Sequence, residues 1–169
     1  MELMRTPPPR FEVVTPAMEH VDGLAHVHVQ GWRDAYGMVL PESFYDDTAL
    51  ERRRNSWAAL LSTLGANQTV RAAVADGHVI GFSFAGPAQD ENLARDQELY
   101  SLYVLSDWYG TGVATALLEG SLREQPAQLW VAQQNARAIA FYRKHGFDLD
   151  GTEKIETRLH DLVEVRMVR

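Results

Sequence analysis

The sequence predicts an α/β (α+β) fold of seven strands and four helices. Two observations carry this prediction. Apolar residues recur at helical spacing in four stretches, and short runs rich in Val, Leu, Tyr and Phe lie between them. With 169 residues, of which 46% are hydrophobic, the chain suits one globular domain with a sizeable core. The predicted order is strand, two helices, three strands, helix, strand, helix, two strands.

Local signals set the expected boundaries. Thr15 can cap the first helix and Pro16 can occupy its first turn, while Thr48 opens a capping box for the second. Asp76-Gly77 is a strong signal for a two-residue hairpin turn. The expected strands are 11–14, 69–75, 78–84, 99–104, 128–131, 148–155 and 162–168. The expected helices run from Pro16 towards Tyr36, from Thr48 to Gly65, from Val113 to Leu122 and from Asn135 to Gly146. Residues 86–97 are expected to form a solvated loop, with a lip over a substrate as the alternative.

Composition and charge exclude several functional classes. The net charge of −7 and pI near 5.3 argue against a general nucleic-acid or anionic-membrane surface and favour cationic amines as partners. The absence of cysteine excludes a thiolate nucleophile and a Cys-ligated zinc site. His20, His26 and His28 lack the spacing of a metal site, so no metal is expected. Residues 1–10 are expected to form a flexible N-terminal extension to a single domain over 11–169, in a cytoplasmic protein.

The junction between strand 99–104 and helix 113–122 predicts an anion site. Gly110 and Gly112 lack side chains, so backbone amides there can approach a ligand closely. The first turn of the following helix has unpaired N–H groups at the positive end of the helix dipole. A pyrophosphate would suit this turn. A tight connection without a ligand is the alternative interpretation.

Residues 109–119 resemble the acyl-CoA signature of the GNAT N-acetyltransferases, Gln/Arg-x-x-Gly-x-Gly/Ala. Gly112 and Ala114 match the pattern, whereas Tyr109 stands where the family usually has Gln or Arg. The stretch 135–147, NARAIAFYRKHGF, also resembles the second cofactor motif of the family, Asn-x-x-Ala-x-x-Phe-Tyr-x-x-x-Gly-Phe, at every defined position. The resemblance covers nearly the whole chain. It implies a GNAT-like mixed, mostly antiparallel twisted sheet of about seven strands, with the four helices on both faces.

The resemblance also implies an activity, which is transfer of an acetyl group from acetyl-CoA to a primary amine by direct attack in a ternary complex. Cofactor-binding residues carried over from the motifs and the central strand are Leu102, Tyr103, Val104, Tyr109, Gly110, Thr111, Gly112, Val113, Ala114, Thr115, Asn135 and Phe141. A backbone N–H near Val104, where the central strand of the family separates from its neighbour, is expected to stabilise the oxyanion.

Two residues are the expected catalytic groups. Tyr142 matches the catalytic tyrosine of the family, and as a phenol it can protonate the departing CoA thiolate. Glu98 opens the central strand, where the family often has an acid, and is the expected base; a solvated glutamate is the alternative. Gln133 and Gln134 stand where many relatives have a further acid, so water or the ionisation of the substrate could also serve.

The acceptor is not specified by the motifs. Residues 31–42 resemble the first helix and its exit in one branch of the family, which implies that Trp32 and Tyr36 bind substrate; core packing is the alternative. We expect a small-molecule amine. A protein N-terminus or lysine, or a module that binds acyl-CoA without turnover, remains open. Dimers are common among the proteins it resembles, so a homodimer is a candidate assembly.

Overall fold

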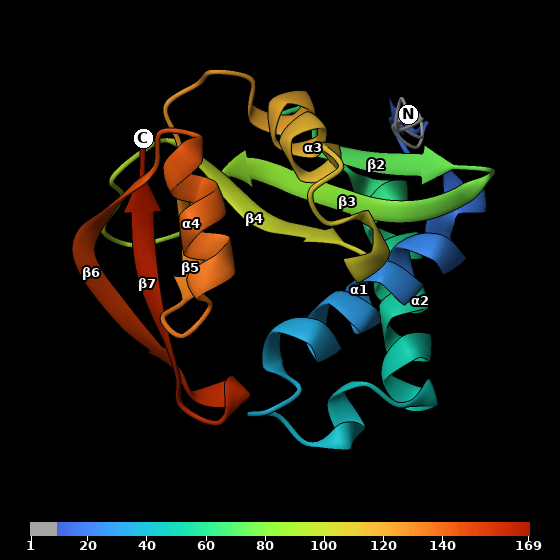
Figure 1. The fold of residues 1–169 in the computed structure, drawn as a ribbon, viewed down its shortest axis with the longest axis horizontal. Coiled ribbons are helices and arrows are strands. Elements are labelled where there is room, and N and C mark those ends of the chain that lie inside the picture. The colour runs from blue at the N-terminus through green and yellow to red at the C-terminus, as the bar shows by residue number, and fades with distance from the viewer. Residues whose placement is uncertain (1–9) are drawn as a thin grey trace, which may run out of the picture.

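A computed structural model describes residues 10–169, and it contains one seven-stranded sheet in the order β1-β2-β3-β4-β5-β7-β6 (Figure 1). β4 and β5 are parallel and every other neighbouring pair is antiparallel. The strands are β1 (Glu12–Val14), β2 (Thr69–Ala75), β3 (His78–Pro87), β4 (Gln97–Val104), β5 (Gln128–Ala132), β6 (Asp148–Glu156) and β7 (Leu162–Val168). The helices are α1 (Val21–Tyr36), α2 (Asp47–Thr63), α3 (Val113–Leu122) and α4 (Ala136–Lys144). The predicted fold class and element order are confirmed.

Side chains alternate between the two faces of the sheet, and each face has its own helices. Ala72, Phe82 and Tyr103 pack with α1 and α2 residues such as Leu24 and Trp57. On the other face, Ile80 and Val104 pack against Val113 and Leu117 of α3. The two layers of helices therefore bury both faces of the central strands.

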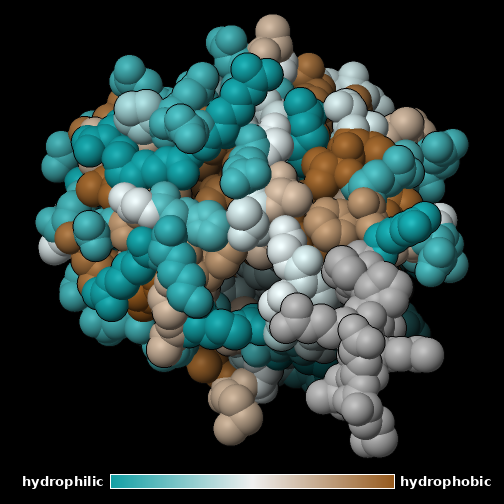
Figure 2. Space-filling view, turned by 45° about the horizontal axis from the view of Figure 1, so that its top comes forward, coloured by the Kyte–Doolittle hydropathy of each residue, from teal (hydrophilic) through white to brown (hydrophobic). Residues whose placement is uncertain are grey.

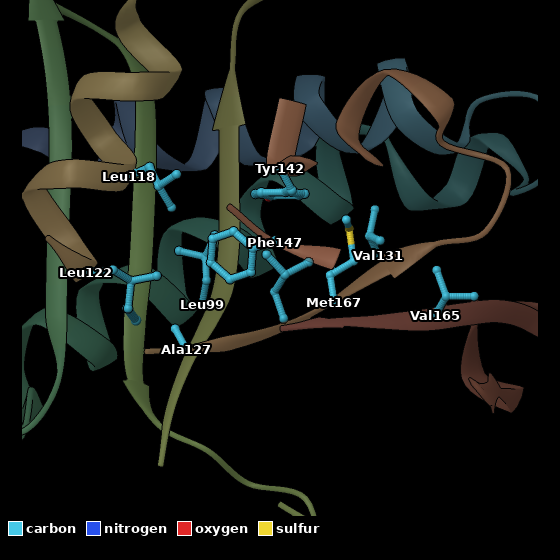
Figure 3. Close-up of a cluster of buried hydrophobic side chains, with 11 residues drawn as sticks. Leu99, Leu118, Leu122, Ala127, Val131, Tyr142, Phe147, Val165 and Met167 are labelled. Atoms are coloured by element: carbon cyan, nitrogen blue, oxygen red, sulfur yellow. The ribbon is translucent and has the colours of Figure 1, made fainter. Parts of the chain in front are cut away.

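A third cluster joins α3 and α4 to β4, β5 and β7. Figure 3 shows Leu118 and Leu122 of α3 pointing toward Leu99 of β4, with Phe147 beside it. Tyr142 of α4 belongs to the same cluster. In Figure 1, α4 lies in front of β5, which it covers on this face. The second motif thus packs directly over the strand pair that contains the parallel contact.

The Asp76-Gly77 turn between β2 and β3 confirms the hairpin prediction. Asp76 and Gly77 have φ values of 48° and 77°. Positive φ at both central residues is what a two-residue turn of the favoured twist requires, and an Asp-Gly pair adopts it readily.

The predicted starts of the first two helices are wrong. Thr15 accepts a hydrogen bond from Arg71 and caps nothing; a 3₁₀ turn at Met18–His20 precedes α1. α2 begins one residue before Thr48, and the Asp46 carboxylate accepts from the Ala49 N–H at 2.8 Å. An aspartate two residues upstream caps as well as a threonine does, so tertiary packing decides which one is used.

The face of the molecule that Figure 2 shows is not continuously apolar. The face in Figure 2 is mostly hydrophilic, with hydrophobic residues in small patches, as the net charge of −7 leads one to expect. No helix within 10–169 combines the length and the apolar character needed to cross a bilayer. The N-terminal extension predicted over 1–10 lies outside the described residues, except for Arg10.

Candidate active site

The strand-to-helix turn has the backbone geometry that an anion site needs. Gly110 and Gly112 have φ values of 74° and 92°, and a Cβ atom at either position would meet nothing within 4 Å. The positive φ explains why glycine is used at both positions, and the open space leaves room for a ligand. The first hydrogen bond of α3 runs from the Ala116 N–H to the Gly112 carbonyl. The N–H groups of residues 113–115 therefore have no acceptor within the helix.

Four of the remaining residues in this motif have structural contacts. The Thr111 hydroxyl donates to the Trp108 carbonyl at 2.6 Å, which closes the loop on itself. The Thr115 hydroxyl lies 3.0 Å from Nε2 of His145 and links α3 to α4. Val113 is fully buried, and Ala114 packs beside it. These contacts engage the side chains within the protein, so the backbone groups are the part of the turn that is available to a ligand.

A cavity of about 330 Å³ opens beside the turn. Asn135 lines this cavity. Its side-chain oxygen accepts from the Ala138 N–H at 3.1 Å and caps α4, so the side-chain amide nitrogen is left for a ligand. Arg137 reaches from the first turn of α4 over Tyr109, with Cζ 3.6 Å from the ring centroid. No carboxylate of residues 10–169 lies within ion-pair distance of Arg137. The cavity is lined by Asp34, Ala35, Tyr109, Gln134, Asn135, Ala136 and Arg137.

β4 and β5 separate immediately after their contact. Only Glu98–Gln128 and Leu99–Leu129 are in register, so the edge of β4 from Tyr100 to Val104 has no strand beside it on that side. Leu102 and Val104 turn toward α3, whereas Tyr103 turns toward α1 and stacks on His28 with ring centroids 5.7 Å apart. Backbone groups of this edge are therefore available to a ligand that enters between the two strands.

Tyr142 is buried between α4 and the separating strands, with 8% of its surface exposed. It packs with Leu99, Leu129 and Val131. Burial, and secondarily the nearby Tyr36 hydroxyl, raise the pKa of Tyr142, which keeps the phenol protonated at neutral pH. Phe141 is half-buried at the edge of this cluster, and its ring packs on His145 at 4.5 Å.

Tyr36 is buried where α1 reaches β5 and β7, in a cluster with Leu40, Ala132 and Leu162. Trp32 packs on Tyr36 at 5.4 Å. The indole N–H of Trp32 is buried and has no hydrogen-bond partner within residues 10–169. Both residues therefore have core contacts, and Trp32 retains one donor that could bind a ligand.

His28 packs among aromatic side chains. Its ring meets four aromatic rings, and Nδ1 accepts from the Trp57 indole at 3.2 Å. Burial, together with the charge of Arg53, lowers the pKa of His28 to about 3. It is neutral at physiological pH. Within the described part of the chain, no three His, Asp or Glu side chains form a group suited to a metal ion.

Glu98 is not a solvated glutamate. It is 8% exposed, and Oε2 accepts from the Gln128 side chain at 3.1 Å and from the Gln89 N–H at 3.4 Å. Burial, and secondarily the Asp90 carboxylate, raise the pKa of Glu98 above its ordinary value of 4.5.

Glu98 faces a second cavity, of about 320 Å³, on the α1 and α2 face of the sheet. Its other members were not anticipated, because they come from five strands and the loop before β4, and no motif marks them. The cavity is lined by Phe84, Gln89, Glu98, Leu99, Tyr100, Trp130, Lys154 and Glu164.

The loop before β4 is largely exposed, as predicted, and it is also anchored by hydrogen bonds. The Asp90 carboxylate accepts from the Trp130 indole at 2.9 Å and from the Gln128 amide at 2.6 Å. Arg166 donates to the Asn92 carbonyl at 2.6 Å. The loop contributes Gln89 to the cavity lining, and its alternative role as a lip over a substrate stays a prediction.

Comparisons with known proteins agree with this geometry. The GNAT acetyltransferase domain family matches residues 66–149. An uncharacterized N-acetyltransferase of Mycobacterium bovis is 36% identical over 103 residues, an alignment that covers 56% of this chain and only 62% of that protein. An uncharacterized N-acetyltransferase of Bacillus subtilis, YuaI, is 28% identical over 135 residues, with 76% and 75% coverage.

Solved structures extend the likeness to nearly the whole chain. The PaiA N-acetyltransferase of Thermoplasma acidophilum, in complex with coenzyme A, superposes with a TM-score of 0.67 at 20% identity, covering 93% of this chain and 98% of that one. The ribosomal-protein-alanine N-acetyltransferase of Brucella melitensis gives a TM-score of 0.70 at 20% identity, with 94% and 98% coverage. Residues 66–149 thus match the GNAT acetyltransferase domain family, and the fold seen in GNAT acetyltransferases extends over nearly the whole chain.

Proposed function

We propose that this protein transfers an acetyl group from acetyl-CoA to a primary amine of a small molecule, by direct attack in a ternary complex. One observation carries the proposal: β4 and β5 pair over two residues and then separate between the glycine turn and the buried Tyr142. A pantetheine arm could enter there, with its pyrophosphate at the amides that follow Gly112. The coenzyme A complex of the Thermoplasma neighbour supports acetyl-CoA as donor.

Three groups would divide the chemistry. Glu98 takes a proton from the ammonium, directly or through water, because its raised pKa favours proton uptake. The free amine then attacks the thioester carbon, and a backbone N–H near Val104 donates to the developing oxyanion. As the C–S bond breaks, Tyr142 protonates the leaving thiolate and is later reprotonated from water. The products are the N-acetylated amine and free CoA.

The second cavity supports a small cationic acceptor. The Glu98 and Glu164 carboxylates and the Trp130 ring line it, and each can attract an ammonium group. The ammonium of Lys154 already lies 4.3 Å from the Trp130 ring centroid and 3.4 Å from the Glu164 carboxylate. A site that holds a lysine ammonium in this way has the charge and the aromatic surface to receive another primary amine.

A protein acceptor is the second candidate, because the Brucella neighbour is named for acetylation of a ribosomal-protein alanine. The test is a panel of small amines and of peptides with free N-termini or lysines, with release of free CoA as the readout. We expect turnover with small cationic amines. Turnover with peptides alone would transfer the assignment to the protein-acetyltransferase class, and tight CoA binding without turnover would indicate a binding module.

Tyr142→Phe tests the catalytic assignment, because it deletes only the hydroxyl. We expect unchanged CoA affinity and a turnover number reduced about 100-fold. If turnover is unchanged while chemistry limits the rate, Tyr142 is a packing residue and another donor protonates the thiolate.

A further inference from the structure

Lys154 is held inside the cavity that contains the proposed base. It lies on β6 with 39% of its side chain exposed, and its Nζ pairs with Glu164, whose side chain is 15% exposed. The same ammonium lies over the Trp130 ring, and its charge acts on the Glu98 carboxylate to lower its pKa slightly. The chain therefore places one of its own primary amines among the groups proposed to receive the substrate amine.

The strand register places Lys154 level with the C-terminal end of β5, where β5 has separated from β4. Lys154 is opposite Glu164, and Glu164 is opposite Ala132, the last residue of β5. Glu164 helps to raise the pKa of Tyr36, and Tyr36 in turn helps to raise the pKa of Tyr142.

We infer that Lys154 is an acceptor for the enzyme's own acetyl transfer, an inference that rests on the proposed function. Acetyl-CoA is the acetyl donor. The ammonium of Lys154 gives a proton to a cavity carboxylate, and the neutral Nζ attacks the thioester carbon. The N–C bond forms, the C–S bond breaks, and the nitrogen loses its second proton to water. Tyr142 protonates the CoA thiolate and regains a proton from water. The products are Nε-acetyl-Lys154 and free CoA.

Acetylation would change the cavity that the free acceptor must enter. The amide that forms carries no charge, so the ion pair with Glu164 and the cation–π contact with Trp130 are both lost. The Glu164 carboxylate then becomes available to an external ammonium. Self-acetylation would therefore strengthen the preference of the cavity for cationic amines.

The chain supplies its own control, because it has only two lysines, Lys154 and Lys144. Lys144 is exposed at the last turn of α4, outside the second cavity. Non-enzymatic acetylation by acetyl-CoA follows exposure and would modify Lys144 first. Reaction in the cavity would modify Lys154 first.

The experiment incubates the full chain with acetyl-CoA and follows each lysine by peptide mass spectrometry. We expect Lys154 to be acetylated about 100-fold faster than Lys144, at a rate independent of protein concentration. Tyr142→Phe should slow the reaction at Lys154 and leave Lys144 unaffected. Lys154→Arg should keep a cation over Trp130 and abolish the modification in the cavity.

Two results would overturn the inference: equal or preferential acetylation of Lys144, or an unmodified Lys154 in an enzyme that acetylates an external amine. Failure of the proposed function has a different signature, since no amine in the panel would then release CoA.

Discussion

Replacing Arg137 by glutamine should weaken CoA binding about tenfold. Arg137 lies over the Tyr109 ring at 3.6 Å and has no carboxylate partner within residues 10–169. It also lies in the first turn of α4, where the helix dipole disfavours a cation. Tyr109 occupies the position at which the family motif usually has Gln or Arg. We expect Arg137 to supply, from a neighbouring helix, the positive charge that the motif lacks.

The magnitude follows from the exposure of the site. A hydrogen bond to a charged group contributes about 1.5–3 kcal/mol, and about 1.4 kcal/mol corresponds to a tenfold change in affinity. Tyr109 is 40% exposed, so water competes for the contact and the lower value applies. The stack itself is worth only about 0.5–1 kcal/mol at an exposed position, so its loss should not unfold the protein.

The assay is calorimetric titration with CoA and with pantetheine, which has no phosphate. Arg137→Gln should weaken the binding of CoA and leave the binding of pantetheine unchanged. Adding Tyr109→Arg to the same variant should restore CoA binding. Arg158→Gln, at an exposed position remote in sequence from both motifs, is the matched control. Unchanged CoA affinity in Arg137→Gln, or an equal loss for both ligands, would refute the reasoning.

Three further predictions test the turn, the base and the core. Gly112→Val places a side chain at φ 92° beside the pyrophosphate position, and calorimetry should find CoA binding lost in a folded variant. Because burial raises the pKa of Glu98, its carboxylate becomes protonated on acidification at a higher pH than an exposed glutamate would, and activity should fall there. Glu98→Gln should remove this acidic limb from the pH–rate profile and lower turnover about 100-fold. Phe82→Ala deletes a fully buried ring. The free energy of unfolding, measured by urea denaturation, should fall by about 3–5 kcal/mol.

The elements best predicted from the sequence are those whose determinants are local. The bounds of α3 and β7 are as expected, and Asp76-Gly77 forms the expected turn. The starts of α1 and α2 were wrong because several residues in each region can cap a helix. Contacts with distant residues, such as the hydrogen bond from Arg71 to Thr15, decide between them.

The candidate site divides in the same way. The turn at Gly112 and the helix at Asn135 could be read from short motifs, because each is built from consecutive residues. The cavity at Glu98 could not. Trp130, Lys154 and Glu164 come together through the pairing of β5 with β7 and of β7 with β6, and strand order is not encoded in a local pattern.

The surroundings of Glu98 favour a functional carboxylate over a structural one. A buried carboxylate that only stabilises a fold is usually paired with a cation. Here no ion pair to Glu98 is found within residues 10–169, and the Gln128 side-chain amide donates to both the Glu98 and the Asp90 carboxylates, at 3.1 and 2.6 Å. Lys154 contributes only the smallest of the effects on the Glu98 pKa. The charge of the Asp90 carboxylate helps to raise the pKa of Glu98, so this arrangement favours proton uptake by Glu98. Such a carboxylate is poised to accept a proton from an ammonium that enters the cavity.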